Sequence, residues 1–416
     1  MLSHIQVAAT EIERVRGDVP VMYDREDTFF SFVERRPVEV VNSRDMRAPL
    51  ELRPGGNFGH FDADGGDLGR GDGPVFDKAL IPTTNLKFAV EWTAKAQWTT
   101  DDKRKAVIDT FRHLMANSMA EYRRHIDTLA IGSAGDGVLG TVESTSNSGG
   151  VDTVVLTNTN GARLLRYGQP INVYSSTLAT NRTAGAEKEI TYLDGATRTI
   201  KVPTVTGLVA GDKIVVSGVS ATPPVSLLGV LYHHNGAVTG SWLGLDRALV
   251  PEVRANRVNA AGALALPHAR MALNKIGERL GMGKGRRLTA WMHPAQLQAY
   301  EDLANLSVVI NKSPSSREGL DLYWGDNITI AGIPIKTHWA WPKDRIDFIA
   351  NDSWYRAEMH PVGFYEVGGT RIWPIRGASG GIATSSIFYY VGSFNFALAN
   401  PAAVAYIDGL TVPAGF

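Results

Sequence analysis

The sequence contains no cysteine, and this absence excludes disulfide bonds, thiolate metal sites and cysteine nucleophiles together. It has no excess of charge, because 42 lysines and arginines balance 42 aspartates and glutamates. A protein that condenses nucleic acid through its own charge is expected to carry a basic excess or a basic tail, and neither is present. No apolar run approaches the ~20 residues of a membrane span, and the N-terminal residues lack the apolar core of a signal peptide. We therefore expect a soluble protein that acts in the cytoplasm and does not contact a membrane.

The chain has ample material for a hydrophobic core. Of its 416 residues 44% are hydrophobic, and the aromatic residues comprise nine Trp, thirteen Tyr and fourteen Phe. This composition excludes global disorder, and the length indicates two or three domains.

A stretch rich in glycine and aspartate, residues 55–73, reads GGNFGHFDADGGDLGRGDG. Apolar and polar residues alternate on both sides of it, over residues 46–52 and more strongly over residues 86–98. Strict alternation is typical of a half-buried strand. The sequence therefore predicts a long hairpin with the glycine-rich stretch at its apex. At ~3.3 Å per residue, the second strand would project it by roughly 40 Å.

A long helix is predicted next. Apolar residues recur at helical spacing between Val107 and Leu129. Thr100 is suited to the N-cap, and Gly132 is suited to end the helix. A helix of this length would span roughly 45 Å at ~1.5 Å per residue.

The rest of the chain divides by composition. Residues 133–224 contain short strand-like segments with frequent turns, among them a two-residue hairpin turn at Asp194-Gly195, which predicts a small β-barrel or sandwich inserted in a larger domain. From Leu264 helices return, with Pro267 near the start of one and Pro294 in the first turn of the next. The remainder reads as strands. Because helices and strands are segregated, the predicted fold class is α+β.

The acidic residues Asp62, Asp64 and Asp67 are the candidate metal ligands, since hard oxygen atoms suit calcium. Their spacing does not match an EF-hand loop, so we interpret the stretch as a solvated, flexible apex, with a bound cation as the alternative. The segment Gly377–Gly381 matches G-x-S-x-G, the nucleophile elbow of hydrolases. That elbow needs a helix after it, and a strand is predicted here, which favours a simple turn.

The remaining motifs give no catalytic set. Residues 281–287, GMGKGRR, fail the phosphate-loop pattern and are interpreted as a helix end followed by a basic loop, which could contact a neighbouring chain or nucleic acid. His233 and His234 are adjacent, so a strand would point them to opposite faces, and no metal-binding spacing accompanies them. Asn181-Arg182-Thr183 fits a glycosylation acceptor but has no secretory signal beside it. We expect no catalytic, cofactor-binding or metal-binding residues, no cofactor, and a protein that is not an enzyme.

The order of these parts resembles the major capsid proteins of tailed bacteriophages, which have the Hong Kong 97-like fold. The resemblance is carried by MRAPLELRPGG and NLKFAVEWTAKAQW for the extended loop (E-loop) and by TTDDKRKAVIDTFRHLMANSMAEYRRHIDTLAIG for the spine helix. GLVAGDKIVVSG is similar to insertion segments of such proteins, and IAGIPIKTHWAWPKDRIDFIANDSWY to the region that leaves the axial domain. The resemblance implies six parts: an N-terminal arm (1–43), the E-loop hairpin (44–98), the spine helix of the peripheral domain (99–134), a β-rich insertion domain (135–228), a mainly axial domain (229–345) and closing strands of the peripheral and axial domains (346–416).

The resemblance also implies a function. The chain would be the major capsid protein of a tailed double-stranded DNA phage, made and assembled in the cytoplasm of the host bacterium into the icosahedral shell of the virion. Implied partners are copies of itself in hexamers and pentamers, either a separate scaffolding protein or none, portal and decoration proteins, and packaged DNA through non-specific contacts. The E-loop would contact neighbouring subunits, since an isolated hairpin is marginal in water. The expected assembly contacts are Leu86, Phe88, Val90, Trp92, Trp98, Arg47, Arg53 and Arg70.

Some family members cross-link a lysine to an asparagine. Lys78, Lys87 and Lys95 lie near the E-loop, but nothing in the sequence identifies a partner for any of them. Three other functions stay open: an encapsulin-type nanocompartment shell, a hydrolase with a β-rich accessory domain, and a different phage structural protein. Enclosed cargo protein would indicate the first, and a pocket with convergent titratable groups would indicate the second.

Overall fold

The computed structural model describes residues 28–36, 39–40, 45–60, 64, 69–93, 104–219, 221–281, 288–308, 329–376 and 382–415. Internal contacts divide the chain into two compact units. Unit 1 takes the described parts of Met1–Phe32, Thr83–Thr128 and Glu358–Phe394, and unit 2 takes those of Val33–Pro82, Leu129–Ala357 and Asn395–Phe416. Neither unit is a continuous segment, because the chain passes between them repeatedly.

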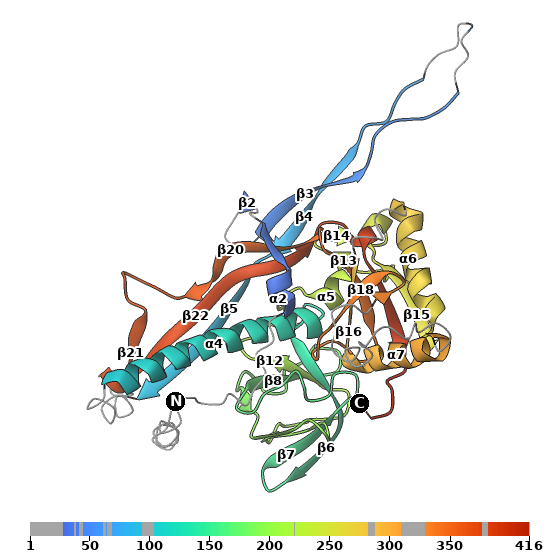
Figure 1. Cartoon of the computed structure of the whole chain (residues 1–416). Coiled ribbons are helices and arrows are strands. Elements are labelled where there is room, and N and C mark those ends of the chain that lie inside the picture. The colour runs from blue at the N-terminus through green and yellow to red at the C-terminus, as the bar shows by residue number, and fades with distance from the viewer. Residues whose placement is uncertain are drawn as a thin grey trace. The chain divides into compact units, whose positions relative to one another are not determined.

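Unit 1 is built on one long helix and a sheet (Figure 1). Helix α4 (Arg104–Gly132) lies where the sequence predicts a helix and ends at the predicted glycine. Strand β5 (Thr84–Thr93) pairs antiparallel with the long strand β22 (Ile382–Leu398). Rings from the three elements form the core: Phe88 lies 6.0 Å from Tyr122, and Tyr122 stacks on Tyr390 at 6.2 Å between ring centroids. The other elements with residues in unit 1 are α2 (Thr28–Phe32), β20 (Trp354–Phe364) and β21 (Ile372–Arg376).

The hairpin around the glycine-rich stretch has a different second strand from the predicted one. Strand β3 (Asp45–Arg53) pairs antiparallel with β4 (Val75–Pro82), whereas the strongly alternating segment is β5, paired with β22. The prediction that residues 86–98 form the second hairpin strand was therefore wrong. Alternation of apolar and polar residues indicates that one face of a strand is buried, and in β5 this face packs on α4. The alternation does not identify the neighbouring strand.

The β-rich segment forms a closed barrel in unit 2. Its strands make one antiparallel sheet in the order β10-β11-β7-β6-β12-β8-β9. The two terminal strands belong to one segment, residues 188–194, which pairs with β8 at its start and with β11 at its end, so the sheet closes on itself. Of the two predicted forms, the structure has the barrel. The strands are β6 (Val138–Ser148), β7 (Val151–Leu156), β8 (Pro170–Tyr174), β9 (Lys188–Glu189), β10 (Tyr192–Asp194), β11 (Thr199–Pro203) and β12 (Lys213–Val216).

The turn at Asp194-Gly195 is longer than predicted. Asp194 pairs with Thr199, which leaves four residues in the loop instead of two. The Asp194 carboxylate accepts hydrogen bonds from the Ala196 amide at 2.9 Å and the Thr197 hydroxyl at 2.6 Å. These bonds lower the pKa of Asp194 and close the loop locally. The prediction of a two-residue turn was wrong, because the side chain selects a wider loop.

A six-stranded mixed sheet forms the second part of unit 2. Its order is β15-β23-β19-β16-β18-β17, with two parallel pairings, β15 to β23 and β16 to β18. Helix α6 begins beside Pro267 and ends at Gly281, and helix α7 begins at Pro294, as the sequence predicts. The elements are β15 (Asn256–Gly262), α6 (Leu266–Leu280), β16 (Leu288–Met292), α7 (Pro294–Val308), β17 (Thr329–Ile330), β18 (Ile333–Thr337), β19 (Ile346–Ala350) and β23 (Ala405–Leu410).

Short elements complete unit 2. They are β1 (Glu34–Arg36), β2 (Glu39–Val40), α5 (Val230–His233), β13 (Ser241–Trp242), β14 (Leu245–Asp246), η3 (Pro251–Val253) and η6 (Pro401–Ala403). Among the described residues, no helix has the length and apolar character needed to span a membrane.

Candidate functional site

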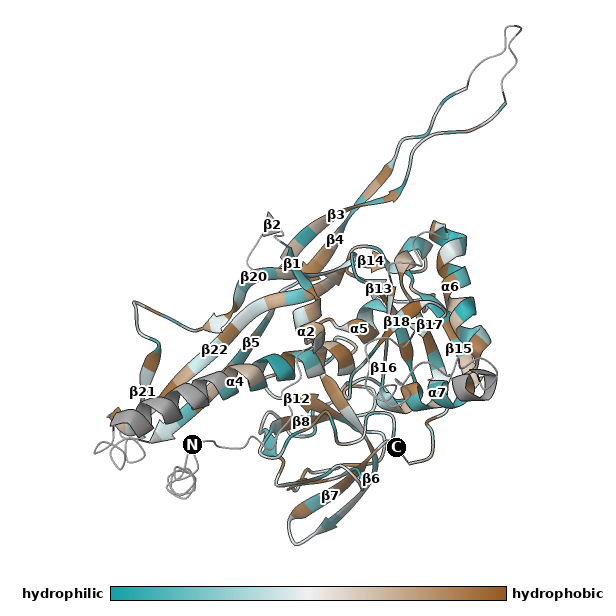
Figure 2. Ribbon diagram, in the orientation of Figure 1, coloured by the Kyte–Doolittle hydropathy of each residue, from teal (hydrophilic) through white to brown (hydrophobic). Residues whose placement is uncertain are grey.

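The root of the β3–β4 hairpin is packed into unit 2. The two strands stay in register from the pair Asp45 and Pro82 outward to the pair Arg53 and Val75. At the inner end Met46 and Ile81 face each other and are fully buried, and Figure 2 shows this hydrophobic part of β4. The root is therefore held by the hydrophobic effect, like any core strand pair.

Two polar contacts also fix the root. The Leu80 amide of β4 donates to the Leu243 carbonyl, at 2.8 Å, in the turn between β13 and β14. The Asn395 side chain, fully buried, donates to the Pro82 carbonyl at 2.8 Å and accepts from the Leu228 amide at 2.8 Å. Since both groups of this amide are used, Asn395 joins the end of the hairpin to the segment before α5.

The outer part of the hairpin has no core of its own. All described residues from Arg53 to Lys78 are exposed. The side chains of Phe58 and Phe76 are 99% and 66% exposed, which is unusual for large apolar residues without a partner surface. The strands remain linked beyond β3 by the Gly56 amide, which donates to the Asp72 carbonyl at 2.8 Å. The outer hairpin thus presents apolar side chains on a two-stranded ribbon (Figure 1).

The charge of the hairpin is slightly negative. Residues 46–82 contain four lysines and arginines and six aspartates and glutamates, a formal net charge of 4 − 6 = −2. Arg53 forms an exposed ion pair with Glu252 at 3.3 Å, a type of contact that contributes at most about 1 kcal/mol. Arg47 is half-buried opposite Leu80, and Arg70 is exposed. The three arginines lie at separate points along the hairpin, and their contact with other subunits stays a prediction.

Four of the five apolar residues that the sequence predicts as assembly contacts lie elsewhere. Leu86, Phe88, Val90 and Trp92 belong to β5, are half-buried and pack within unit 1. Phe88 contacts α4, and Trp92 lies 5.7 Å from Phe388 of β22 between ring centroids. The sequence analysis predicted these residues as assembly contacts because it placed them on the hairpin, and that placement was wrong. Their contact with other subunits stays a prediction.

Several predicted features lie outside the described residues: Trp98, Lys95, Asp62, Asp67, the segment Gly377–Gly381, residues 282–287 of the basic loop and the N-terminal arm up to residue 27. Asp64 is described and exposed. In the described part of the chain, no cluster of three or more His, Asp or Glu side chains could hold a metal ion.

The histidine pair occupies a position that the sequence did not predict. His233 ends the short helix α5 and His234 follows it, and both are fully buried instead of lying on a strand. His234 Nδ1 lies 2.8 Å from the Asp347 carboxylate, which Arg345 also binds through three contacts of 2.7–3.0 Å. The Arg345 and His234 partners hold the pKa of Asp347 down, to about 2, against its burial. Arg345 and Asp347 are two positions apart in the sequence, but His234 is 113 positions from Asp347 and is brought to this pair only by the fold.

No protein-family model matches the chain, and no curated protein matches its sequence. Its fold does match solved structures over nearly the full length. The capsid protein in the asymmetric unit of cyanophage A-1(L) is 12% identical with a TM-score of 0.54, covering 95% of both chains. The capsid protein of the empty GTA particle is 12% identical with a TM-score of 0.50, covering 95% of this chain and 93% of that one. The chain therefore has the Hong Kong 97-like capsid fold that the sequence resemblance implied.

Proposed function

We propose that the chain is the major capsid protein of a tailed double-stranded DNA bacteriophage, which assembles into an icosahedral shell around the genome. The observation that carries the proposal is the match of the fold to capsid proteins over 95% of the chain. In this proposal the protein has a structural role and catalyses no reaction. It is made in the bacterial cytoplasm and ends in the virion.

The parts of the fold take the roles that the resemblance implies. The β3–β4 hairpin is the E-loop, α4 is the spine helix and the closed barrel is the insertion domain. The outer hairpin supports this assignment, because an exposed ribbon carrying Phe58 and Phe76 gains stability only when another surface covers it. That surface belongs to a neighbouring copy of the chain in a hexamer or pentamer. Because the hairpin has a net charge of −2, a basic surface on the neighbouring copy would complement it.

Expression of the chain alone, followed by size-exclusion chromatography and negative-stain imaging, tests the proposal. Uniform hollow shells are the expected result, and capsomers or irregular aggregates would indicate that a separate scaffolding protein is needed. A monomer that stays monomeric at high concentration would contradict the proposal. Shells that enclose a specific protein instead of DNA, when isolated from the native source, would identify an encapsulin-type compartment.

Deletion of residues 55–73 tests the role of the hairpin. The deleted residues bury no side chain among those described, so the subunit should fold with an unchanged melting temperature and assemble poorly. Gly195→Ala in the exposed barrel loop, where a Cβ meets nothing within 4 Å, is the control variant and should assemble normally. Normal shells from the deletion would refute the assembly role of the hairpin.

Portal, decoration and scaffolding proteins are further partners that the proposal implies. Packaged DNA would meet the inner surface through arginines and lysines without sequence preference. Tight binding of a purified subunit to one defined DNA sequence at physiological salt would count against this mode of contact.

A further inference from the structure

We propose that α5 and the turn between β13 and β14 form a latch that orients the β3–β4 hairpin, and that protonation of His233 opens this latch. The latch is defined here as Tyr232, His233, Trp242 and Leu243. All four lie in unit 2, together with both strands of the hairpin.

The turn is held to α5 by two hydrogen bonds. The Trp242 indole N–H donates to His233 Nδ1 at 3.1 Å, and the Leu243 amide donates to the Tyr232 hydroxyl at 2.9 Å. Leu243 has a φ of 48°, a left-handed conformation that a branched side chain seldom adopts. Such a residue persists only where its surroundings hold it, so the turn depends on these contacts.

The same turn holds the hairpin. The Leu243 carbonyl accepts the Leu80 amide of β4, and Gly244 lies so close to Leu80 that a Cβ would approach its side chain to 3.2 Å. Release of the turn from α5 leaves the Leu243 carbonyl free to move, which weakens one of the two polar contacts at the root. The orientation of the hairpin then depends on Asn395, the buried root and the weaker contacts of β3 with β2 and of Arg53 with Glu252.

The hydrogen bonds of His233 require a neutral ring in one tautomer. An indole N–H can only donate, so Nδ1 must carry no proton, and Nε2 donates to the Phe396 carbonyl at 3.1 Å. A proton on Nδ1 would face the indole N–H of Trp242 and break that bond. Burial makes a positive charge on the His233 ring unfavourable, and so do two neighbouring groups. These are His234 and the guanidinium of Arg247, which donates to the Tyr232 carbonyl. On the far side of His234, Asp347 is already paired with Arg345 and is not free to offset the charge on His233.

The size of the effect follows from proton linkage. Burial lowers the pKa of His233 to about 3, whereas an opened latch returns the ring to its ordinary value near 6.5. Between pH 3 and pH 6.5, His233 is therefore mainly protonated in the open latch and mainly neutral in the closed latch. Lowering the pH from 7.5 to 5.0 should therefore raise the ratio of open to closed latch by about 30-fold.

Hydrogen–deuterium exchange of the full-length chain tests the latch. We expect peptides containing Leu80 and residues 241–247 to exchange about 30-fold faster at pH 5.0 than at 7.5, after correction for intrinsic chemistry. Peptides of the barrel strand β11 are the control: exchange through local opening of the barrel exposes neither His233 nor His293, so it should not change in this way. His233→Gln supplies an amide oxygen for Trp242 and an amide N–H for Phe396 without a titratable group, so its pH response should fall below about two-fold. His360→Gln, at an exposed histidine in unit 1, should respond like the parent chain.

Two results would overturn the proposal: latch peptides that respond to pH no more than β11, or a full response in His233→Gln. Where His233→Gln does not fold, Trp242→Phe replaces it, since removal of the indole N–H should speed exchange of Leu80 at pH 7.5 and reduce the response to acid. The exchange measurement does not depend on shells. Only its consequence, loosening of the shell near pH 5, rests on the proposed function, so failure of assembly and failure of the latch are distinguishable.

Discussion

Substitution of Gly229 by alanine should separate two elements that touch through their backbones. A Cβ on Gly229 would lie 1.9 Å from the Ala130 carbonyl oxygen and 2.6 Å from its carbonyl carbon. Contacts to carbon are optimal near ~3.5–4.0 Å, so neither distance is tolerable. Both atoms belong to the last turn of α4, and no side chain can rotate to relieve the overlap. The end of α4 and the start of α5 must move apart.

The expected cost is at the upper end of the range for overpacked sites. Extra carbon atoms in a packed interior typically cost ~1–3 kcal/mol, and a clash with backbone leaves little room for relaxation, so we expect a loss of about 3 kcal/mol. At ~2–4 °C for each kcal/mol, the melting temperature should fall by about 6–12 °C. Because α5 carries the latch residues Tyr232 and His233, the hairpin root should also lose protection from hydrogen exchange.

Calorimetry on paired variants measures this cost. Gly195→Ala is the matched control, because its Cβ meets nothing within 4 Å in the exposed barrel loop. It should change the free energy of unfolding by no more than about 0.5 kcal/mol. If Gly229→Ala and Gly195→Ala melt together, the close approach of α5 to α4 is not a feature of the folded protein and the argument is refuted.

Three further predictions concern the root, the buried histidines and the hairpin surface. Asn395→Ala removes the side-chain partner of the Leu228 amide and of the Pro82 carbonyl, which should cost about 2–6 kcal/mol at ~1–3 kcal/mol for each group, and an unchanged urea midpoint would contradict this. Burial lowers the pKa of His233 and His293 to about 3, below their unfolded value near 6.5, so stability is complete above pH 6.5 and declines as the pH falls toward 3. At pH 5.0 the urea midpoint should report a loss of about 2 kcal/mol for each histidine, and equal midpoints at pH 5.0 and 7.5 would count against it. Phe76→Ser should reduce shell yield while leaving the melting temperature unchanged, whereas Val209→Ser, at an exposed barrel position, should assemble normally.

The helices were the part of the fold that the sequence predicted best. Apolar spacing over α4, a terminal glycine at Gly132 and the prolines at the starts of α6 and α7 are local signals, and the structure confirms each helix. Local signals suffice there because the hydrogen bonds of a helix join residues close in sequence. The barrel also followed from local signals, since frequent turns limit the length of each strand.

Strand partners and the latch could not be predicted in the same way. The pairing of β5 with β22 joins residues about 300 positions apart, and nothing local distinguishes it from a pairing with β3. The hydrogen bond between Leu80 and Leu243 also joins residues far apart in the sequence and uses only backbone atoms, so no side-chain pattern predicts it. His233 and His234 have no motif around them, and their burial is set by tryptophans that arrive from β13 and β20.

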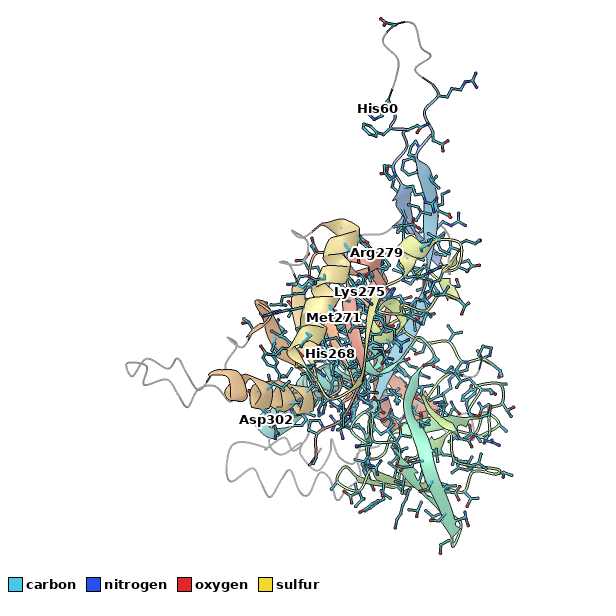
Figure 3. The ribbon with its side chains drawn as sticks, turned by 90° about the vertical axis from the view of Figure 1, so that its right-hand side faces the viewer. His60, His268, Met271, Lys275, Arg279 and Asp302 are labelled. Atoms are coloured by element: carbon cyan, nitrogen blue, oxygen red, sulfur yellow. The ribbon has the colours of Figure 1, made fainter. Side chains whose placement is uncertain are left out.

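The positions of the unpaired strand edges support the proposal that the hairpin contacts other copies of the chain. A subunit at high local concentration must prevent its strands from pairing at random with neighbours. In unit 2 the barrel closes through residues 188–194. Helix α6 contacts the edge strand β15 at one carbonyl, since Lys275 donates to Arg257 at 2.5 Å. Arg279 of α6 donates to the carbonyl of Arg254, just before the strand, at 2.7 Å (Figure 3). Beyond the short pairing with β2, the described part of β3 has no neighbour on its outer side. The hairpin therefore retains an open strand edge with exposed aromatic residues, whereas the barrel closes on itself and β15 is contacted by α6. This difference favours the hairpin as a surface that meets another chain.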